Sequence, residues 1–174
     1  KVIGSQGHRE VEREIAERAV TLLASRDGKR PDSLQQGDRI VIVAAEEETA
    51  KQLERQLKLA SNNLSLQTEI AILGQAQTKE TVAKADYVIL ASYQFRNVAS
   101  QFGWGAYQAL INEMNTRNQR YTLLSLGNPY ETIYLKNIRS GLAVYGKQEP
   151  NTEAGINVLV GHQEATGKLP VKTN

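Results

Sequence analysis

The sequence predicts an α/β protein: a three-layer sandwich in which a mostly parallel five- or six-stranded sheet carries helices on both faces. Short, nearly continuous apolar runs bounded by turn residues predict strands buried on both faces. Segments with helical spacing alternate with these runs, which is typical of parallel strands joined by right-handed crossovers. The 174 residues suffice for one domain with a substantial core. We therefore expect a single domain over 1–174, with an N-terminal helix and connection (1–37) packed on the sandwich (38–174).

The stretch Tyr121–Tyr130 (YTLLSLGNPY) indicates both the architecture and the edge of the sheet that matters. It begins with apolar and β-favouring residues and stops at Gly127-Asn128-Pro129. Because proline cannot donate to a sheet ladder, Pro129 ends the strand and can begin a helix as its first residue. Ligands of open α/β sheets bind at the carboxyl ends of the strands. A site is therefore expected at the edge where this strand ends.

The first third of the chain predicts two helices and one strand. Apolar residues recur at steps of three and four over 8–25, which predicts an amphipathic helix. The polar segment 26–37, with one proline and two glycines, is typical of an exposed connection. The β-branched run 39–45 predicts a strand, and Thr49 with Gln52 predicts a capping box at the start of the next helix.

The middle of the chain continues the alternation. Residues 65–73 alternate before becoming apolar, which favours a strand nearer an edge of the sheet. A short helix is predicted over 78–85 and a fully apolar strand over 86–92. A loop over 93–105 then leads into a helix over 106–115.

The last third closes the pattern after the strand that begins at Tyr121. A short helix is predicted over 130–137, a strand over 141–145 and a final helix from Asn151 to near Gly161.

Composition excludes several classes of protein. A net charge of +2, from 21 basic and 19 acidic residues, is too balanced to indicate a nucleic-acid partner. The chain has no cysteine and two histidines, so we expect no disulfide and no metal site, and no cofactor motif is present. No apolar run approaches the roughly 20 residues of a membrane span. The chain begins at Lys1 and its only methionine is Met114, so we expect a processed product or an excised piece.

Glu46-Glu47-Glu48 follows the strand 39–45, where a dinucleotide-binding fold would carry a glycine-rich turn. Three carboxylates would repel a phosphate there, so we interpret them as a solvated helix start. His8 and His162 have no acid or nucleophile beside them in sequence. We interpret both as structural or surface histidines rather than catalytic ones.

The loop 93–105 is the strongest candidate for a binding surface. Aromatic rings past the end of a strand can stack on a sugar or on a partner protein, although we favour a local hydrophobic cluster over the sheet edge. There is no Asp or Glu from Tyr87 through Asn112, so this loop cannot supply a carboxylate acid or base. Its aromatic and basic residues are Tyr93, Phe95, Arg96, Phe102 and Trp104.

The turn Asn128-Pro129-Tyr130 is the other candidate. A Gly-Asn-Pro turn after a buried strand suffices for chain reversal and helix initiation. Contact of Asn128 and Tyr130 with a substrate or partner is the alternative that we favour less.

Several blocks, in this order, resemble the C-terminal α/β-sandwich domain of family 3 glycoside hydrolases. They are HREVEREIAERAVTLL, GDRIVIVA, KADYVILASY, TLLSLGNPYE and GLAVYGKQEPNTEAGINVLVGHQEATGKLPV. The resemblance extends from about His8 to Val171 and is closest to the two-domain bacterial β-N-acetylglucosaminidases (β-hexosaminidases). It implies an upstream (β/α)8 barrel and retaining hydrolysis of terminal N-acetylglucosamine from cell-wall fragments or chitooligosaccharides.

The resemblance also implies where the catalytic groups lie. In the hexosaminidase branch they belong to the barrel, so no catalytic residue is assigned to this chain. In the β-glucosidase branch the sandwich donates a glutamate from a loop past a central strand. The matching loop here, 93–105, has no carboxylate, which favours the hexosaminidase branch.

Two functions of different class follow from these observations. The first is the non-catalytic C-terminal domain of a β-N-acetylhexosaminidase, with its own upstream barrel as partner and an N-acetylglucosamine-containing glycan as a possible ligand. We expect that enzyme to be extracellular or attached to the cell envelope rather than cytoplasmic. The alternative is a free-standing glycan- or protein-binding module that uses the aromatic loop 93–105. An enzyme with its own complete site ranks third, because the acidic residues lie mainly on predicted helices and connections.

Overall fold

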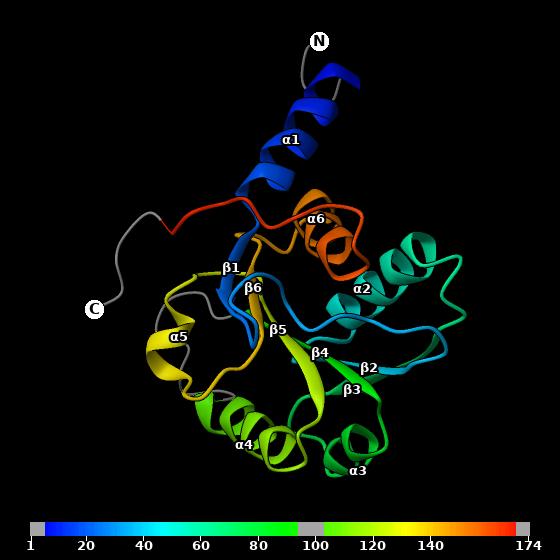
Figure 1. Cartoon of the computed structure of the whole chain (residues 1–174), viewed down its shortest axis with the longest axis vertical. Coiled ribbons are helices and arrows are strands. Elements are labelled where there is room, and N and C mark those ends of the chain that lie inside the picture. Colours follow the sequence, from blue (N-terminus) through cyan, green and yellow to red (C-terminus); the bar gives the residue numbers. More distant parts are fainter. Residues whose placement is uncertain (1–5, 94–102, 170–174) are drawn as a thin grey trace.

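The computed structural model describes residues 6–93 and 103–169, and within them it confirms the predicted α/β sandwich (Figure 1). Six strands form one sheet in the order β1-β6-β5-β4-β2-β3. Five strands are parallel, and β1 pairs antiparallel with β6. The strands are β1 (Thr21–Ala24), β2 (Arg39–Ala44), β3 (Gln67–Ile72), β4 (Tyr87–Ser92), β5 (Arg120–Ser125) and β6 (Gly141–Ala143).

Helices cover both faces of this sheet (Figure 1). On one face lie α1 (Gln6–Ala19), α2 (Glu47–Ala60) and α6 (Glu149–Leu159), and on the other lie α3 (Thr78–Ala83), α4 (Gly103–Thr116) and α5 (Glu131–Tyr134). Successive side chains of β2 point alternately into the two hydrophobic cores on either side of the sheet. Ile40 and Ile42 belong to the core beneath α2 and α6, while Val41 and Val43 belong to the core beneath α3 and α4. All four are fully buried, which explains why the strand contains no polar position after its first residue.

The predicted helix over 8–25 is wrong in its last third. α1 ends at Ala19, and Thr21–Ala24 forms the antiparallel strand β1 at the edge of the sheet. A three-to-four spacing of apolar residues in so short a segment is compatible with either structure. Pairing with β6 satisfies backbone groups that the sheet edge would otherwise leave unpaired, and this tertiary contact decides the conformation.

The predicted capping box is also wrong. α2 begins at Glu47, its N-cap residue Glu46 makes no side-chain capping hydrogen bond, and Thr49 lies within the first turn. The amide Nε2 of Gln52 instead donates to the carbonyl oxygen of Lys147 at 2.9 Å and to Oγ1 of Thr152 at 2.8 Å. These bonds tie α2 to the start of α6, which a local sequence pattern cannot reveal.

Three helix boundaries differ from those predicted. α4 begins at Gly103, so Trp104 lies in its first turn rather than in a loop. α5 is a single turn, Glu131–Tyr134, and does not reach Asn137. α6 begins at Glu149 because Pro150, whose missing N–H is not needed in the first turn, extends the helix toward its start.

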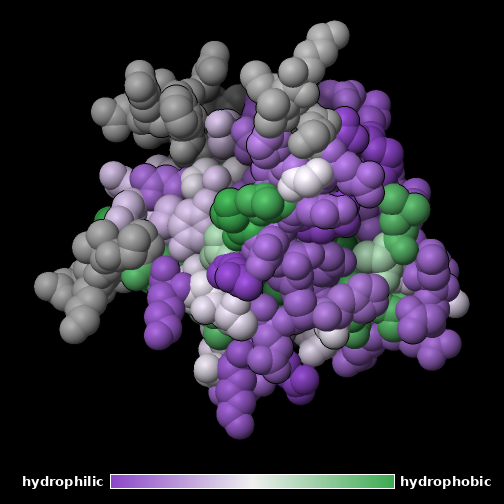
Figure 2. All heavy atoms as spheres, turned by 90° about the horizontal axis from the view of Figure 1, so that it is seen from above, coloured by the Kyte–Doolittle hydropathy of each residue, from purple (hydrophilic) through white to green (hydrophobic). Residues whose placement is uncertain are grey.

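The surface of the molecule is predominantly hydrophilic on the face seen in Figure 2, with small, separate hydrophobic patches. Five large hydrophobic side chains are exposed among the described residues: Val11, Ile15, Leu59, Ile133 and Tyr134. Within 6–93 and 103–169, no helix combines the length and apolar character that a membrane crossing requires.

Replacement of Gly155 by alanine will destabilise the sandwich. A Cβ atom at Gly155 would lie 2.7 Å from Cγ1 of Val144 and 3.0 Å from Cδ1 of Leu124, both fully buried. We expect a loss of about 1–3 kcal/mol in the free energy of unfolding, measured by urea titration, because a stiff β-branched neighbour cannot easily move away. The control is Gly105→Ala in α4, where nothing lies within 4 Å of the added carbon. Equal stabilities of the two variants would contradict the packing of α6 on β5 and β6.

Candidate functional site

The carboxyl ends of β2 and β4 mark the topological switch point of the sheet. From β2 the chain passes through α2 on one face to β3, and from the neighbouring β4 it passes through α4 on the other face to β5. Such points are where open α/β sheets bind their ligands. Glu46 follows β2 and Tyr93 follows β4, so both residues lie at this switch point.

Lys147 joins these two residues from the segment after β6. Its ammonium nitrogen lies 4.7 Å from the ring centroid of Tyr93 and 3.2 Å from Oε2 of Glu46. A cation over an aromatic ring beside a carboxylate is a stable arrangement in which each charge has a partner. We call Glu46, Tyr93 and Lys147 the switch-point cluster.

The backbone that carries Lys147 is fixed by α2 and α6. Its carbonyl oxygen accepts the bond from Gln52 described above, and Nδ2 of Asn151 donates to the carbonyl oxygen of Val144 at 2.8 Å. A Cβ atom on Gly146 would lie 2.5 Å from Oε1 of Gln148, so a larger residue in this turn would displace that side chain. The position of Lys147 therefore follows from the packing of the two helices.

A second group of side chains, the aromatic cluster, joins the start of α4 to α5. Trp104 stacks on Tyr134 with ring centroids 5.4 Å apart and planes 8° from parallel, and it lies 5.9 Å from the ring of the buried Tyr107. Gln108 holds the two helices together, because its amide donates to the carbonyl oxygen of Lys136 and accepts from the N–H of the same residue. Tyr134 remains 60% exposed, so the outer side of the cluster can meet a ligand or a partner.

The turn after β5 has the geometry of a structural turn. Oδ1 of Asn128 accepts a hydrogen bond from the N–H of Tyr130 at 2.9 Å, which is an Asx turn that leads into α5. Pro129 is buried, whereas Asn128 is exposed and Tyr130 is half-buried. The remaining predicted site residues, Phe95 and Arg96, lie outside the described residues.

The structure brings the predicted residues into two places rather than one. Tyr93 belongs to the switch-point cluster and Trp104 to the aromatic cluster. The sequence did not single out Lys147 or Tyr134, because Lys147 lies far from Tyr93 along the chain and Tyr134 sits in a segment that reads as an ordinary helix.

The described part of the carboxyl edge holds no pair of groups arranged for acid–base chemistry. Glu46 is paired with Lys147, and the next carboxylate, Glu47, is paired with Lys51 at 2.8 Å. All three glutamates are exposed at the start of α2, which confirms their interpretation as a solvated helix start. The histidines lie elsewhere, His8 on α1 and His162 beyond the end of α6. In the parts of the chain that the structure describes, no group of three His, Cys, Asp or Glu side chains could hold a metal ion.

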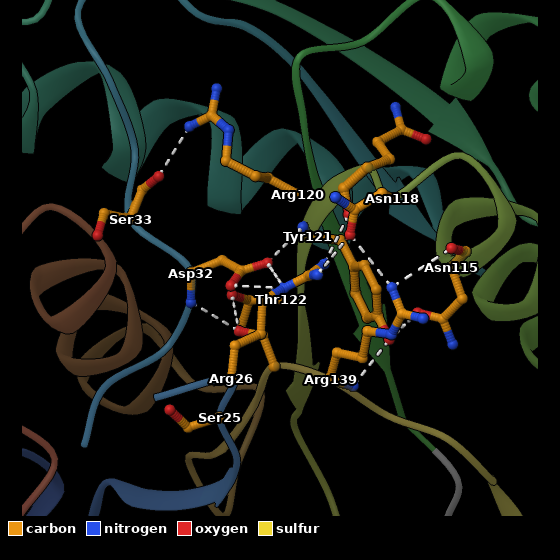
Figure 3. Close-up of polar contacts among 12 residues, drawn as sticks. Ser25, Arg26, Asp32, Ser33, Asn115, Asn118, Arg120, Tyr121, Thr122 and Arg139 are labelled. Carbon is orange, nitrogen blue, oxygen red and sulfur yellow. Dashed lines mark hydrogen bonds and ion pairs between the residues drawn. The ribbon is translucent and has the colours of Figure 1, made fainter. Parts of the chain in front are cut away.

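The densest polar network lies at the opposite, amino edge of the sheet (Figure 3). There the connection between β1 and β2 crosses the beginnings of the central strands. The carboxylate of Asp32 accepts from Nε of Arg26 with both oxygens at 3.0 Å and from the N–H of Tyr121 at 3.3 Å. Asp38 accepts two bonds from Arg120, at 2.7 and 3.0 Å. The two aspartates are 8% and 6% exposed, although they belong to a connection that its composition predicts to be solvated.

A chain of buried hydroxyl groups completes this network. The hydroxyl of Tyr87 donates to the carbonyl oxygen of Asp32 at 2.7 Å and contacts Oγ1 of Thr122, which in turn contacts Oγ of Ser140 at 2.8 Å. Oγ of Ser140 accepts the N–H of Asp32. Because these groups satisfy one another, the network clamps the connection to the sheet and offers nothing to a ligand.

Comparison with known proteins identifies the fold. No protein-family model and no curated protein matches the chain by sequence. A fungal multi-domain GH3 β-N-acetylglucosaminidase matches with a TM-score of 0.73 and 20% identity, over 97% of this chain and 19% of that chain. A glycoside hydrolase family 3 β-N-acetylglucosaminidase from Paenibacillus sp. str. FPU-7 matches with a TM-score of 0.70 and 21% identity, over 97% and 33%. A β-glucosidase from Listeria innocua matches with a TM-score of 0.65 and 12% identity, over 92% and 26%.

These similarities confirm the predicted resemblance at the level of the fold. The chain has an α/β-sandwich fold that family 3 glycoside hydrolases contain as one part of a longer chain. It spans 19–33% of the length of the solved structures just named.

Replacement of Tyr87 by phenylalanine will weaken the clamp and change how stability depends on pH. Loss of the hydroxyl leaves the carbonyl oxygen of Asp32 without its donor, so we expect the free energy of unfolding at neutral pH to fall by about 1–3 kcal/mol. Burial raises the pKa of Tyr87 above its ordinary value of 10.0. The folded state therefore holds this proton more tightly than the unfolded state, and the stability it contributes is lost as the pH rises above 10.0.

As the pH rises from neutral to above 10.0, the free energy of unfolding of the variant should consequently fall by less than that of the native chain. Urea titration at each pH measures both. The control is Tyr134→Phe, at a ring that is 60% exposed. A native and a Tyr87→Phe chain with parallel pH profiles would contradict the burial of this hydroxyl.

Proposed function

We propose that this chain is the non-catalytic sandwich domain of a family 3 β-N-acetylhexosaminidase and supports that enzyme's upstream (β/α)8 barrel. The observation that carries the proposal is the combination of this fold with a carboxyl edge whose described part lacks an acid–base pair. The solved structures with this fold belong to much longer enzymes, which supports a role as one part of such an enzyme.

The chemistry of glycoside hydrolysis supports the non-catalytic role. Retention requires a nucleophilic carboxylate and a second proton-transfer group about 5–5.5 Å away. At the switch point Glu46 is paired with Lys147, and the segment after β4 contains no Asp or Glu as far as Asn112. The reacting carboxylates are therefore assigned to the barrel.

The choice of substrate rests on the same segment. The similar structures include β-N-acetylglucosaminidases and β-glucosidases. A sandwich without a carboxylate in the segment after β4 favours a β-N-acetylglucosaminidase, because the resemblance places the catalytic residues of those enzymes on the barrel. The proposed substrates are cell-wall or chitin-derived glycans with a terminal N-acetylglucosamine, and the proposed location is extracellular or at the cell envelope.

Activity assays on two proteins test this proposal. The 174-residue chain should hydrolyse neither an aryl N-acetyl-β-glucosaminide nor an aryl β-glucoside above the uncatalysed rate. The full polypeptide encoded by the same gene should hydrolyse the N-acetylated substrate and prefer it over the glucoside. Turnover by the 174-residue chain, or a preference of the full polypeptide for the glucoside, would contradict the assignment.

One observation favours a second function, a glycan- or protein-binding module. Tyr134 exposes 60% of its surface while it stacks on Trp104, the only tryptophan of the chain. Exposed aromatic rings of this kind bind the apolar faces of sugars.

Fluorescence titration separates the two functions. If the chain is a glycan-binding module, N-acetylglucosamine oligomers at millimolar concentration will shift the emission of Trp104, and Tyr134→Ala will abolish the saturable part of that shift. If it is the supporting domain proposed above, neither protein will respond. Leu59→Ala is the control, since that side chain is 76% exposed on α2 and is not part of the aromatic cluster.

A further inference from the structure

α1 has two apolar sides, and only one of them is used by this chain. Ala16 is 3% exposed and packs into the core beneath α6, whereas Val11 and Ile15 are 53% and 63% exposed. Residues four apart lie on the same side of a helix, so Val11 and Ile15 form one continuous patch. We call these two residues the outer face of α1.

Two hydrogen bonds from the segment after α6 anchor the C-terminal end of α1. Nε2 of Gln163 donates to the carbonyl oxygen of Glu17, and the N–H of Gly167 donates to that of Val20. All residues over 6–15 are exposed, and this part of α1 extends away from the sheet (Figure 1). A helix of this length is marginal in water without packing. Packing of its outer face against another surface would therefore stabilise α1.

The size of the outer face indicates which partner could pack against it. Complete burial of the exposed parts of two such side chains favours association by roughly ten- to a hundredfold. Two separate molecules that bind with a dissociation constant of about 1 mM need an association favoured by roughly a thousandfold at the 1 M standard state. A specific interface also buries about 800 Å² on each partner. Two side chains are far fewer than the roughly 20–30 residues that each partner of a specific interface contributes, so neither a second copy of this chain nor a free partner protein fits.

A domain joined to this chain by the polypeptide does fit. Covalent attachment gives a partner an effective concentration of about millimolar, so a small contact is enough to hold it. We infer that the outer face of α1 packs against a second domain of the same polypeptide. The inference rests on the proposed function, in which that domain is the barrel. α1 then lies between the two bodies, with Ala16 on the sandwich and Ile15 on the other domain.

Hydrogen exchange in the full polypeptide tests the inference. The backbone amides of α1 should exchange at least about tenfold more slowly there than in the 174-residue chain, because packing suppresses local opening. Ile15→Gln should remove most of this protection while α2 and α6 keep theirs. The matched control is Leu59→Gln, at a side chain that is 76% exposed on α2 and has no exposed apolar neighbour four residues away.

Each outcome decides the matter. Equal exchange of α1 in the two proteins, or equal effects of Ile15→Gln and Leu59→Gln, would overturn the inference even if the full polypeptide is an active hexosaminidase. Protection of α1 in a full polypeptide without hexosaminidase activity would support the inference and refute the proposed function. Protection of α1 in the 174-residue chain that rises with protein concentration and is lost in Ile15→Gln would overturn it in favour of a second copy.

Discussion

The crossing of the amino edge by the connection between β1 and β2 is the constraint on which the rest of the structure depends. β1 lies at one edge of the sheet and β2 lies four places along, so the chain must pass the beginnings of β6, β5 and β4. It is bonded to each of them in turn, to Ser140 before β6, to Arg120 in β5 and to Tyr87 in β4. Ion pairs as buried as those of Asp32 and Asp38 add little net stability, but they are costly to break. Their effect is to fix one path and therefore one strand order.

This crossing gives the two edges of the sheet different roles. The amino edge is occupied by a connection whose polar groups hydrogen-bond to one another and to the sheet, so its role is structural. The carboxyl edge carries the switch-point cluster and, at the start of α4, the aromatic cluster. The sheet interior between them is mostly apolar, as the complete burial of Val88 and Leu123 illustrates. Differences in function among proteins of this fold are therefore expected to arise from the carboxyl edge and from the outer surfaces of the helices.

The sequence predicted the parts of the fold that depend on local pattern. β2, β4 and β5 are apolar runs that only a doubly covered strand tolerates, and the alternation of β3 correctly indicated an edge. β1 was not predicted, because its four residues show no clear periodicity of apolar side chains. Its conformation is determined by pairing with β6. Neither Asp38 nor Lys147 was recognised as a contact residue. Each meets its partner across a separation of 82 or 101 residues, and nothing local distinguishes it from a solvated charge.

The switch-point cluster differs from a catalytic crevice in how its charges are compensated. In a catalytic crevice, charges remain incompletely compensated so that a transition state can complete them. Here Lys147 is compensated twice, by the carboxylate of Glu46 and by the ring of Tyr93. A ligand that approached this group would have to replace contacts of similar strength and would gain little. In the described part of the chain, the exposed apolar groups include Tyr134 and the outer face of α1, and exposed apolar surface promotes association.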